Sequence, residues 1–190
     1  MWWSKPIPVR LVKEYAYCPR YAYFQVYVSR DYVTPSMEVA REEPEKPVPK
    51  FRGWEVVKDV RVYSKRLNLA GIADAVLRRG GEVKVVEFKL LTDISKRSLR
   101  GRHRHVLAQA LGYGVCAEET FSSTLSGVVV VGRSGYVEVR VTPALRSYLY
   151  SVVDGVRRML VDEEPPPPTP LNPSACGYCR FRDLCQSLMA

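Results

Sequence analysis

The sequence lacks any long hydrophobic run that is free of charged residues. Arg, Lys, Glu or Asp interrupts every apolar segment, whereas a membrane-spanning helix needs about 18 or more consecutive apolar residues. The first ten residues, MWWSKPIPVR, also lack the apolar segment and small-residue cleavage site of a secretory signal. We therefore expect a cytoplasmic protein that neither crosses nor binds a membrane.

Acidic residues are scarce relative to basic ones, with 20 Asp and Glu against 29 Lys and Arg and a formal net charge of +9. The composition, 46% hydrophobic and 26% charged, excludes a disordered chain. A basic surplus of this size favours a polyanionic partner, because guanidinium groups match phosphate oxygens in pairs. Net charge alone leaves nucleic-acid binding about as probable as not.

The pattern of apolar residues predicts helices and strands in alternation. Proline after Cys18 divides residues 9–33 into two helical pieces, and a short helix ends near Glu43 before three prolines. Two-residue periodicity then predicts strands, and amphipathic spacing predicts helices. The predicted strands are 54–64, 67–79, 82–88, 127–132 and 136–141, and the later helices are 103–118 and 143–164.

These elements predict an α/β (α+β) fold in which helices flank a central sheet. We expect an N-terminal helical region over residues 1–50 and a core over residues 51–164. A proline linker and a cysteine-bearing segment follow over residues 165–190. We expect the three parts to form a single compact unit.

Three of the five cysteines stand close together near the C-terminus, at C-x2-C-x5-C spacing: Cys176, Cys179 and Cys185. This spacing is typical of a metal centre that needs one more ligand. Cys18, in a Cys-Pro-Arg turn, is the better candidate, because Cys116 lies among apolar helix residues and reads as a core side chain. A disulfide is disfavoured inside the cell, but zinc and iron–sulfur both remain open.

Two carboxylates lie on the predicted strands 67–79 and 82–88, and pairing through Gly80–Gly81 would bring Asp74 close to Glu87. Glu87 and Lys89 share one face of their strand. Two carboxylates can bind Mg²⁺ or Mn²⁺, and a neighbouring lysine can stabilise charge on a phosphate. A surface ion pair is the alternative, although the apolar neighbours of Asp74 make an uncompensated carboxylate there costly.

A basic segment follows these residues and leads into the helix that carries Gln109 and Tyr113. It would suit a phosphodiester substrate; a solvated loop and an ordinary pair of helical neighbours are the alternatives. Its candidate DNA-binding side chains are Lys96, Arg97, Arg100, Arg102 and Arg104.

Taken in order, Gly71-x-x-Asp74, Glu87-x-Lys89 and Gln109-x-x-x-Tyr113 resemble the motifs of the RecB-type branch of the PD-(D/E)XK nuclease superfamily. Together with the cysteines, they make the chain similar to CRISPR-associated RecB-type exonucleases that carry an iron–sulfur cluster. The resemblance implies a central mixed sheet, a cluster joining the N- and C-terminal segments, and metal-dependent cleavage of DNA from single-stranded ends. It also implies a role in spacer acquisition beside the CRISPR integrase complex.

The resemblance further assigns a role to each matching residue. It implies that Asp74, Glu87 and the main-chain carbonyl of Phe88 bind Mg²⁺ or Mn²⁺, and that Lys89 is the catalytic lysine. Gln109 and Tyr113 would position substrate. A cluster, [4Fe–4S] in preference to [2Fe–2S], would be held by Cys18, Cys176, Cys179 and Cys185.

The chain departs from the family pattern at one ligand. The family usually has a histidine in a Gly-x-x-x-His setting before the strands, where this sequence has Ala40 and Pro44. Proline cannot bind a metal; the candidate substitutes are Glu42, Glu43, His103 and His105. A catalytically impaired DNA-binding subunit of the CRISPR adaptation complex, and a zinc-stapled nucleic-acid-binding protein, are therefore the competing hypotheses.

Overall fold

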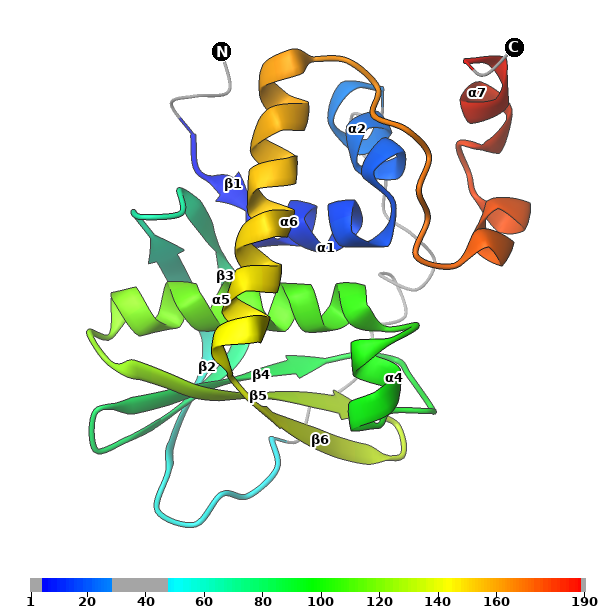
Figure 1. The fold of residues 1–190 in the computed structure, drawn as a ribbon. Coiled ribbons are helices and arrows are strands. Elements are labelled where there is room, and N and C mark those ends of the chain that lie inside the picture. The colour runs from blue at the N-terminus through cyan, green and yellow to red at the C-terminus, as the bar shows by residue number, and fades with distance from the viewer. Residues whose placement is uncertain (1–4, 29–47, 189–190) are drawn as a thin grey trace.

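The computed structural model describes residues 5–28 and 48–188, which form a mixed sheet with helices packed against it (Figure 1). The strands are β1 (Ile7–Pro8), β2 (Glu55–Ser64), β3 (Leu69–Arg79), β4 (Glu82–Phe88), β5 (Thr124–Gly132) and β6 (Gly135–Arg140). The helices are α1 (Val9–Tyr17), α2 (Pro19–Tyr27), α4 (Lys96–Arg100), α5 (Arg104–Thr120), α6 (Pro143–Asp162), the 3-10 helix η2 (Pro173–Tyr178) and α7 (Arg182–Ser187).

The sheet has the order β1-β3-β4-β5-β6, and β2 pairs with β3. β2, β3 and β4 form the predicted antiparallel meander, and β5 and β6 form a second hairpin. β4 and β5 are parallel, so the chain must cross over between them, and α5 makes that crossover. The predicted central mixed sheet flanked by helices is confirmed.

Helix α5 lies across one face of the sheet, with α1 and α6 packed over it (Figure 1). Every residue of α5 from Val106 to Ala117 is buried, because the helix is enclosed by the sheet below and the other helices above. Close packing extends to the backbone: a Cβ atom on Gly114 would lie 2.7 Å from a methyl carbon of Leu125 on β5. The main core therefore surrounds α5.

The opposite face of the sheet carries a smaller apolar cluster of Ala75, Leu77, Val86 and Val129. The segment before β2 covers this cluster with Phe51 and Trp54. The guanidinium of Arg79 lies 4.5 Å from the centre of the Trp54 ring, a cation–π contact that holds the covering segment on the sheet.

The helix break at Cys18 is confirmed, since α1 ends at Tyr17 and α2 begins at Pro19. The predicted helix ending near Glu43 lies outside the described residues. Strand β1 and the short helices α4, η2 and α7 were not predicted from the sequence. Within the described ranges, none of the helices combines the length and apolar character needed to cross a membrane.

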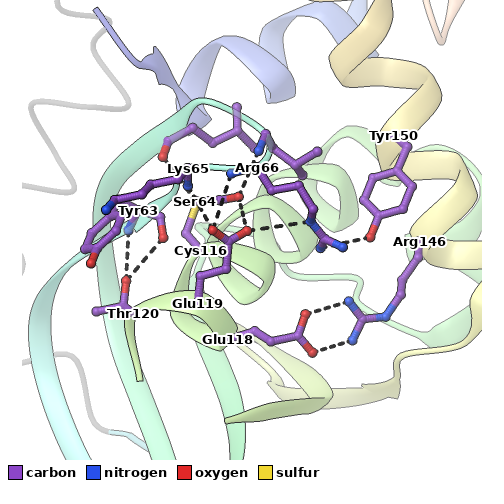
Figure 2. A network of polar contacts seen from close by, with 12 residues as sticks. Tyr63, Ser64, Lys65, Arg66, Cys116, Glu118, Glu119, Thr120, Arg146 and Tyr150 are labelled. Atoms are coloured by element: carbon purple, nitrogen blue, oxygen red, sulfur yellow. Dashed lines mark hydrogen bonds and ion pairs between the residues drawn. The ribbon is translucent and has the colours of Figure 1, made fainter. Parts of the chain in front are cut away.

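Two adjacent glutamates at the end of α5 bind the neighbouring elements (Figure 2). Glu119 accepts hydrogen bonds from the Ser64 hydroxyl and from the backbone N–H groups of Lys65, at 2.8 Å, and Arg66. Glu118 accepts two hydrogen bonds from Arg146 of α6, at 2.7 and 2.8 Å. Burial raises the pKa of Glu118, but the Arg146 hydrogen bonds outweigh it and leave that pKa below its usual value. These contacts tie the β2–β3 turn and α6 to α5.

The Glu119→Ala substitution should destabilise the fold. It leaves the buried Ser64 hydroxyl and two backbone N–H groups of the turn without their acceptor, so we expect a loss of about 1–3 kcal/mol in the free energy of unfolding. Chemical denaturation of the variant measures this loss. The matched control is Glu164→Ala, at an exposed position after α6, and an equal effect of the two substitutions would contradict the role of Glu119.

Candidate active site and cysteine centre

The pairing of β3 with β4 brings the two predicted carboxylates together. Ala75 pairs with Val86 in this antiparallel register, so the next pair outward is Asp74 and Glu87. The backbone N–H of Phe88 donates a 2.8 Å hydrogen bond to Asp74 Oδ2. The side chain of Phe88 packs into the small cluster on the opposite face, which leaves Glu87 and Lys89 together on the face covered by α5.

Glu87 is an almost fully buried carboxylate, with 3% of its surface exposed. Its Oε1 atom accepts a 2.6 Å hydrogen bond from Lys89 Nζ, whereas Oε2 is buried and has no hydrogen-bond partner among the described residues. Burial raises the pKa of Glu87, the nearby Asp74 raises it further, and Lys89 opposes both. A buried carboxylate oxygen without a partner, beside a second carboxylate, fits a divalent cation, which prefers oxygen ligands.

Helix α5 adds Gln109 and Tyr113, which lie one turn apart on one face of the helix. Burial and the charges of Glu87 and Asp74 raise the pKa of Tyr113 to about 12, and a hydrogen bond with Gln109 opposes them. Gly71 of β3 leaves space for the tyrosine, because a Cβ atom there would lie 2.7 Å from Tyr113 Cε1. All three motifs of the resemblance thus lie around the two carboxylates.

Sequence reasoning missed one charged residue of this site, Lys13 of α1. Its charge lowers the pKa of Glu87 and that of His105, and its Nζ atom lies 3.0 Å from Glu14. The signal was absent from the sequence, since only the packing of α1 on α5 brings Lys13 to the site.

The basic segment begins directly beside the carboxylates. After Lys89, whose N–H bonds to Val131 of β5 at 2.8 Å, the chain runs through a loop into α4 at the end of the sheet (Figure 1). Arg102 forms an ion pair with Asp93, and the Arg104 guanidinium lies 3.8 Å from the centre of the Tyr148 ring. All five predicted DNA-binding side chains are exposed: Lys96, Arg97, Arg100, Arg102 and Arg104.

The C-terminal segment packs against α1 and α2, as Figure 1 shows for the chain beyond α6. Phe181 is buried and contacts the rings of Tyr21 and Phe24, with ring centres 5.4 and 5.2 Å away. The backbone N–H of Leu171 donates a 2.7 Å hydrogen bond to the Tyr17 carbonyl. Arg20 donates a 2.8 Å hydrogen bond to the Pro166 carbonyl.

These contacts place Cys18 near the C-terminal cysteines. Burial raises the pKa of the Cys18 thiol, the backbone N–H groups of Tyr21 and Arg20 oppose that effect, and Cys179 and Cys185 raise it further. The Arg20 guanidinium lies 3.8 Å from Cys185 Sγ. Cys176 is exposed, one turn before Cys179. Cys18 therefore lies close enough to Cys179 and Cys185 for their charges to act on it, and Cys185 lies beside the buried Arg20 side chain.

Cys116 stands apart from this group. It is fully buried in the main core around α5, and burial raises its pKa to about 12.

Among the described side chains, no three of His, Cys, Asp or Glu gather closely enough to hold a single metal ion. Neither His103 nor His105 therefore joins Asp74 and Glu87 in a three-ligand group there.

The chain is similar to proteins of known classification. A sequence model of the PD-(D/E)XK nuclease superfamily matches residues 10–186. The CRISPR-associated exonuclease Cas4 of Aeropyrum pernix is 37% identical over 194 residues, covering 96% of each chain. The protein of the same name from Francisella tularensis subsp. novicida is 24% identical over 94% of this chain and 93% of that protein.

A solved structure has the same fold. The crystal structure of a candidate exonuclease from Eubacterium rectale covers 97% of this chain and 88% of its own, with a TM-score of 0.56 and 14% identity. The superfamily model matches nearly the whole chain, and the Aeropyrum relative covers it at 37% identity. The chain belongs to the PD-(D/E)XK nuclease superfamily, within the family of these CRISPR-associated nucleases.

Proposed function

We propose that the chain is a metal-dependent DNA exonuclease that acts on single-stranded ends during CRISPR spacer acquisition. The observation that carries this proposal is the Oε2 atom of Glu87, which is buried beside Asp74 and Lys89 and has no hydrogen-bond partner within residues 5–28 and 48–188. The exonuclease names of the relatives support the reaction, and the CRISPR association in those names supports the process. The partner in that process would be the CRISPR integrase complex.

Asp74, Glu87 and the Phe88 carbonyl would hold Mg²⁺ or Mn²⁺. When bound, the cation supplies Lewis-acid stabilisation of phosphate charge and makes water a stronger acid. The Lys89 ammonium donates a 2.6 Å hydrogen bond to Glu87 Oε1. From that position it would stabilise the negative charge that develops on the reacting phosphate. Gln109 and Tyr113 form the opposite wall, from which their polar groups orient the substrate.

The exposed basic side chains of α4 and its flanks would track the DNA backbone. They follow the active site directly in the chain, so a strand whose end lies at Asp74 and Glu87 would continue along them. Phosphate contacts by Lys and Arg are independent of sequence. This arrangement favours an enzyme that degrades DNA ends of any sequence.

Cys18, Cys176, Cys179 and Cys185 would hold an iron–sulfur cluster, with [4Fe–4S] favoured over [2Fe–2S]. The C-x2-C-x5-C spacing of Cys176, Cys179 and Cys185 is typical of a thiolate metal centre. The closeness of Cys18 to Cys179 and Cys185 supports its place as the fourth ligand. Because it would join α2 to the C-terminal segment, its proposed role is structural.

Asp74→Asn should abolish cleavage of end-labelled single-stranded DNA in Mn²⁺ or Mg²⁺, with a loss of about 100-fold or more, because a neutral amide holds a cation poorly. Protein purified without oxygen should shorten linear DNA, and circular single-stranded DNA should persist. Asp154→Asn, at an exposed position on α6, is the matched control. Cleavage by Asp74→Asn at the wild-type rate would contradict the site, and a wild type that binds DNA without cutting it would support the impaired-subunit hypothesis.

Replacing two arginines of α4, Arg97→Gln with Arg100→Gln, should weaken DNA binding and its salt dependence. Each lost phosphate contact lowers the slope of log K against log salt by about 0.7 for a single strand, so we expect a change of about 1.4. Fluorescence anisotropy at several salt concentrations measures it. Arg61→Gln with Lys65→Gln removes the same charge from the β2 edge of the sheet, and an equal change there would show that only net charge matters.

Cys179→Ala should remove most of the iron and acid-labile sulfide from protein purified without oxygen, and it should lower the melting temperature. Cys116→Ala provides the control, because that thiol lies in the core around α5; this variant should keep its iron. Full iron content in Cys179→Ala would show that the ligand assignment is wrong. One zinc ion and no iron in the wild type would support the zinc-stapled alternative.

A further inference from the structure

His105 lies in the first turn of α5, four residues before Gln109 and eight before Tyr113. Residues four apart share one face of a helix, so His105 extends the face that carries the two active-site side chains. The ring of Tyr17 from α1 contacts the imidazole, with the ring centres 5.2 Å apart. The imidazole is therefore held at the α1 end of the active-site wall.

The Nδ1 atom of His105 is buried and has no hydrogen-bond partner among the described residues. Buried polar atoms are nearly always paired, so an unpaired one needs an explanation. Gln109 Oε1 and Glu87 Oε2 are in the same state. Three such atoms among the described residues therefore belong to α5 and to Glu87, which indicates that this site is built to bind further polar groups.

The charges of two lysines from different elements act on His105: Lys13 on α1, and Lys89 directly after β4. Burial, together with the charges of Lys13, His103 and Lys89, lowers the pKa of His105 to about 4. The ring is therefore neutral at physiological pH. When the proton is on Nε2, the Nδ1 lone pair can accept a hydrogen bond from an ammonium group.

Cation binding would give this acceptor a role at Lys89. Its ammonium is bonded to Glu87 Oε1 at 2.6 Å, and a cation held by Oε2 would draw charge from the carboxylate and weaken that bond. Lys89 would then lose part of the contact that holds it in place, and a neutral acceptor on the opposite wall could replace it.

We propose that His105 is a positioning residue that holds Lys89 through its Nδ1 atom, at the position from which the lysine acts on the phosphate. This inference rests on the proposed function and deepens it, because it adds a residue that the three motifs do not contain. It also gives α1 a part in the site, since Tyr17 fixes the plane of the imidazole.

The test compares three substitutions at position 105 in the full-length chain, with steady-state cleavage of single-stranded DNA and thermal melting as readouts. His105→Leu keeps the volume but removes the acceptor, and we expect kcat to fall about tenfold or more, as for a misplaced catalytic group, with KM and melting temperature unchanged. His105→Asn should restore most of the activity, because its amide oxygen occupies the place of Nδ1. His105→Gln should not, because its amide lies nearer the place of Nε2.

A second comparison identifies the lysine that His105 serves. If His105 acts through Lys89, His105→Leu should lower kcat by the same factor in a Lys13→Met background as in the wild type. Disappearance of the effect in that background would assign His105 to Lys13 and overturn the proposal. So would a rise in KM alone, a fall in melting temperature that parallels the loss of activity, or equal activity of the Asn and Gln variants.

These outcomes are separable from a failure of the proposed function. An active wild type whose rate is unaffected by His105→Leu overturns this inference alone. An inactive wild type overturns both.

Discussion

The cost of burying a charged carboxylate is the constraint on which this structure depends. Glu87 lies within the sheet and under α5, with 3% of its surface exposed, and an unpaired charge there would be strongly destabilising. Lys89 offsets part of that cost through one oxygen, and the other oxygen has no hydrogen-bond partner among the described residues. The same burial that makes Glu87 costly to the fold would favour the proposed cation, because it limits competition from water. One side chain, Glu87, therefore carries both the burial cost and the proposed ligand role.

The elements around Glu87 serve to keep that carboxylate enclosed. The β3–β4 register sets Asp74 beside it, and the parallel pairing of β5 with β4 requires the crossover by α5 that covers it. Gly71 lets Tyr113 approach the sheet closely. A side chain at position 71 would clash with the Tyr113 ring and force it to shift. The geometry of the site is therefore fixed by backbone packing as much as by the polar residues.

The C-terminal segment has little core of its own, since α7 has six residues and none of them is buried. Contacts with α1 and α2 hold it, through Phe181 and through Arg20, which reaches both the Pro166 carbonyl and Cys185. Tyr17 belongs to both regions, because its carbonyl binds Leu171 and its ring contacts His105. The proposed cysteine centre and the candidate active site thus share α1 as a common support.

Local sequence was sufficient where the signal is local. Residue periodicity predicted β2, β3, β4 and α5, Pro19 located the break after Cys18, and the Gly80–Gly81 turn implied that Asp74 and Glu87 meet. Lys13, His105 and the parallel β4–β5 pairing depend on which elements pack together, and neither composition nor spacing records that. Helix α4 has only five residues, too few for a periodic pattern. The amino-acid sequence by itself determined which residue types are available to hold a cation or a thiolate centre. Tertiary packing selected their neighbours, because burial and charge act between side chains that are distant along the chain.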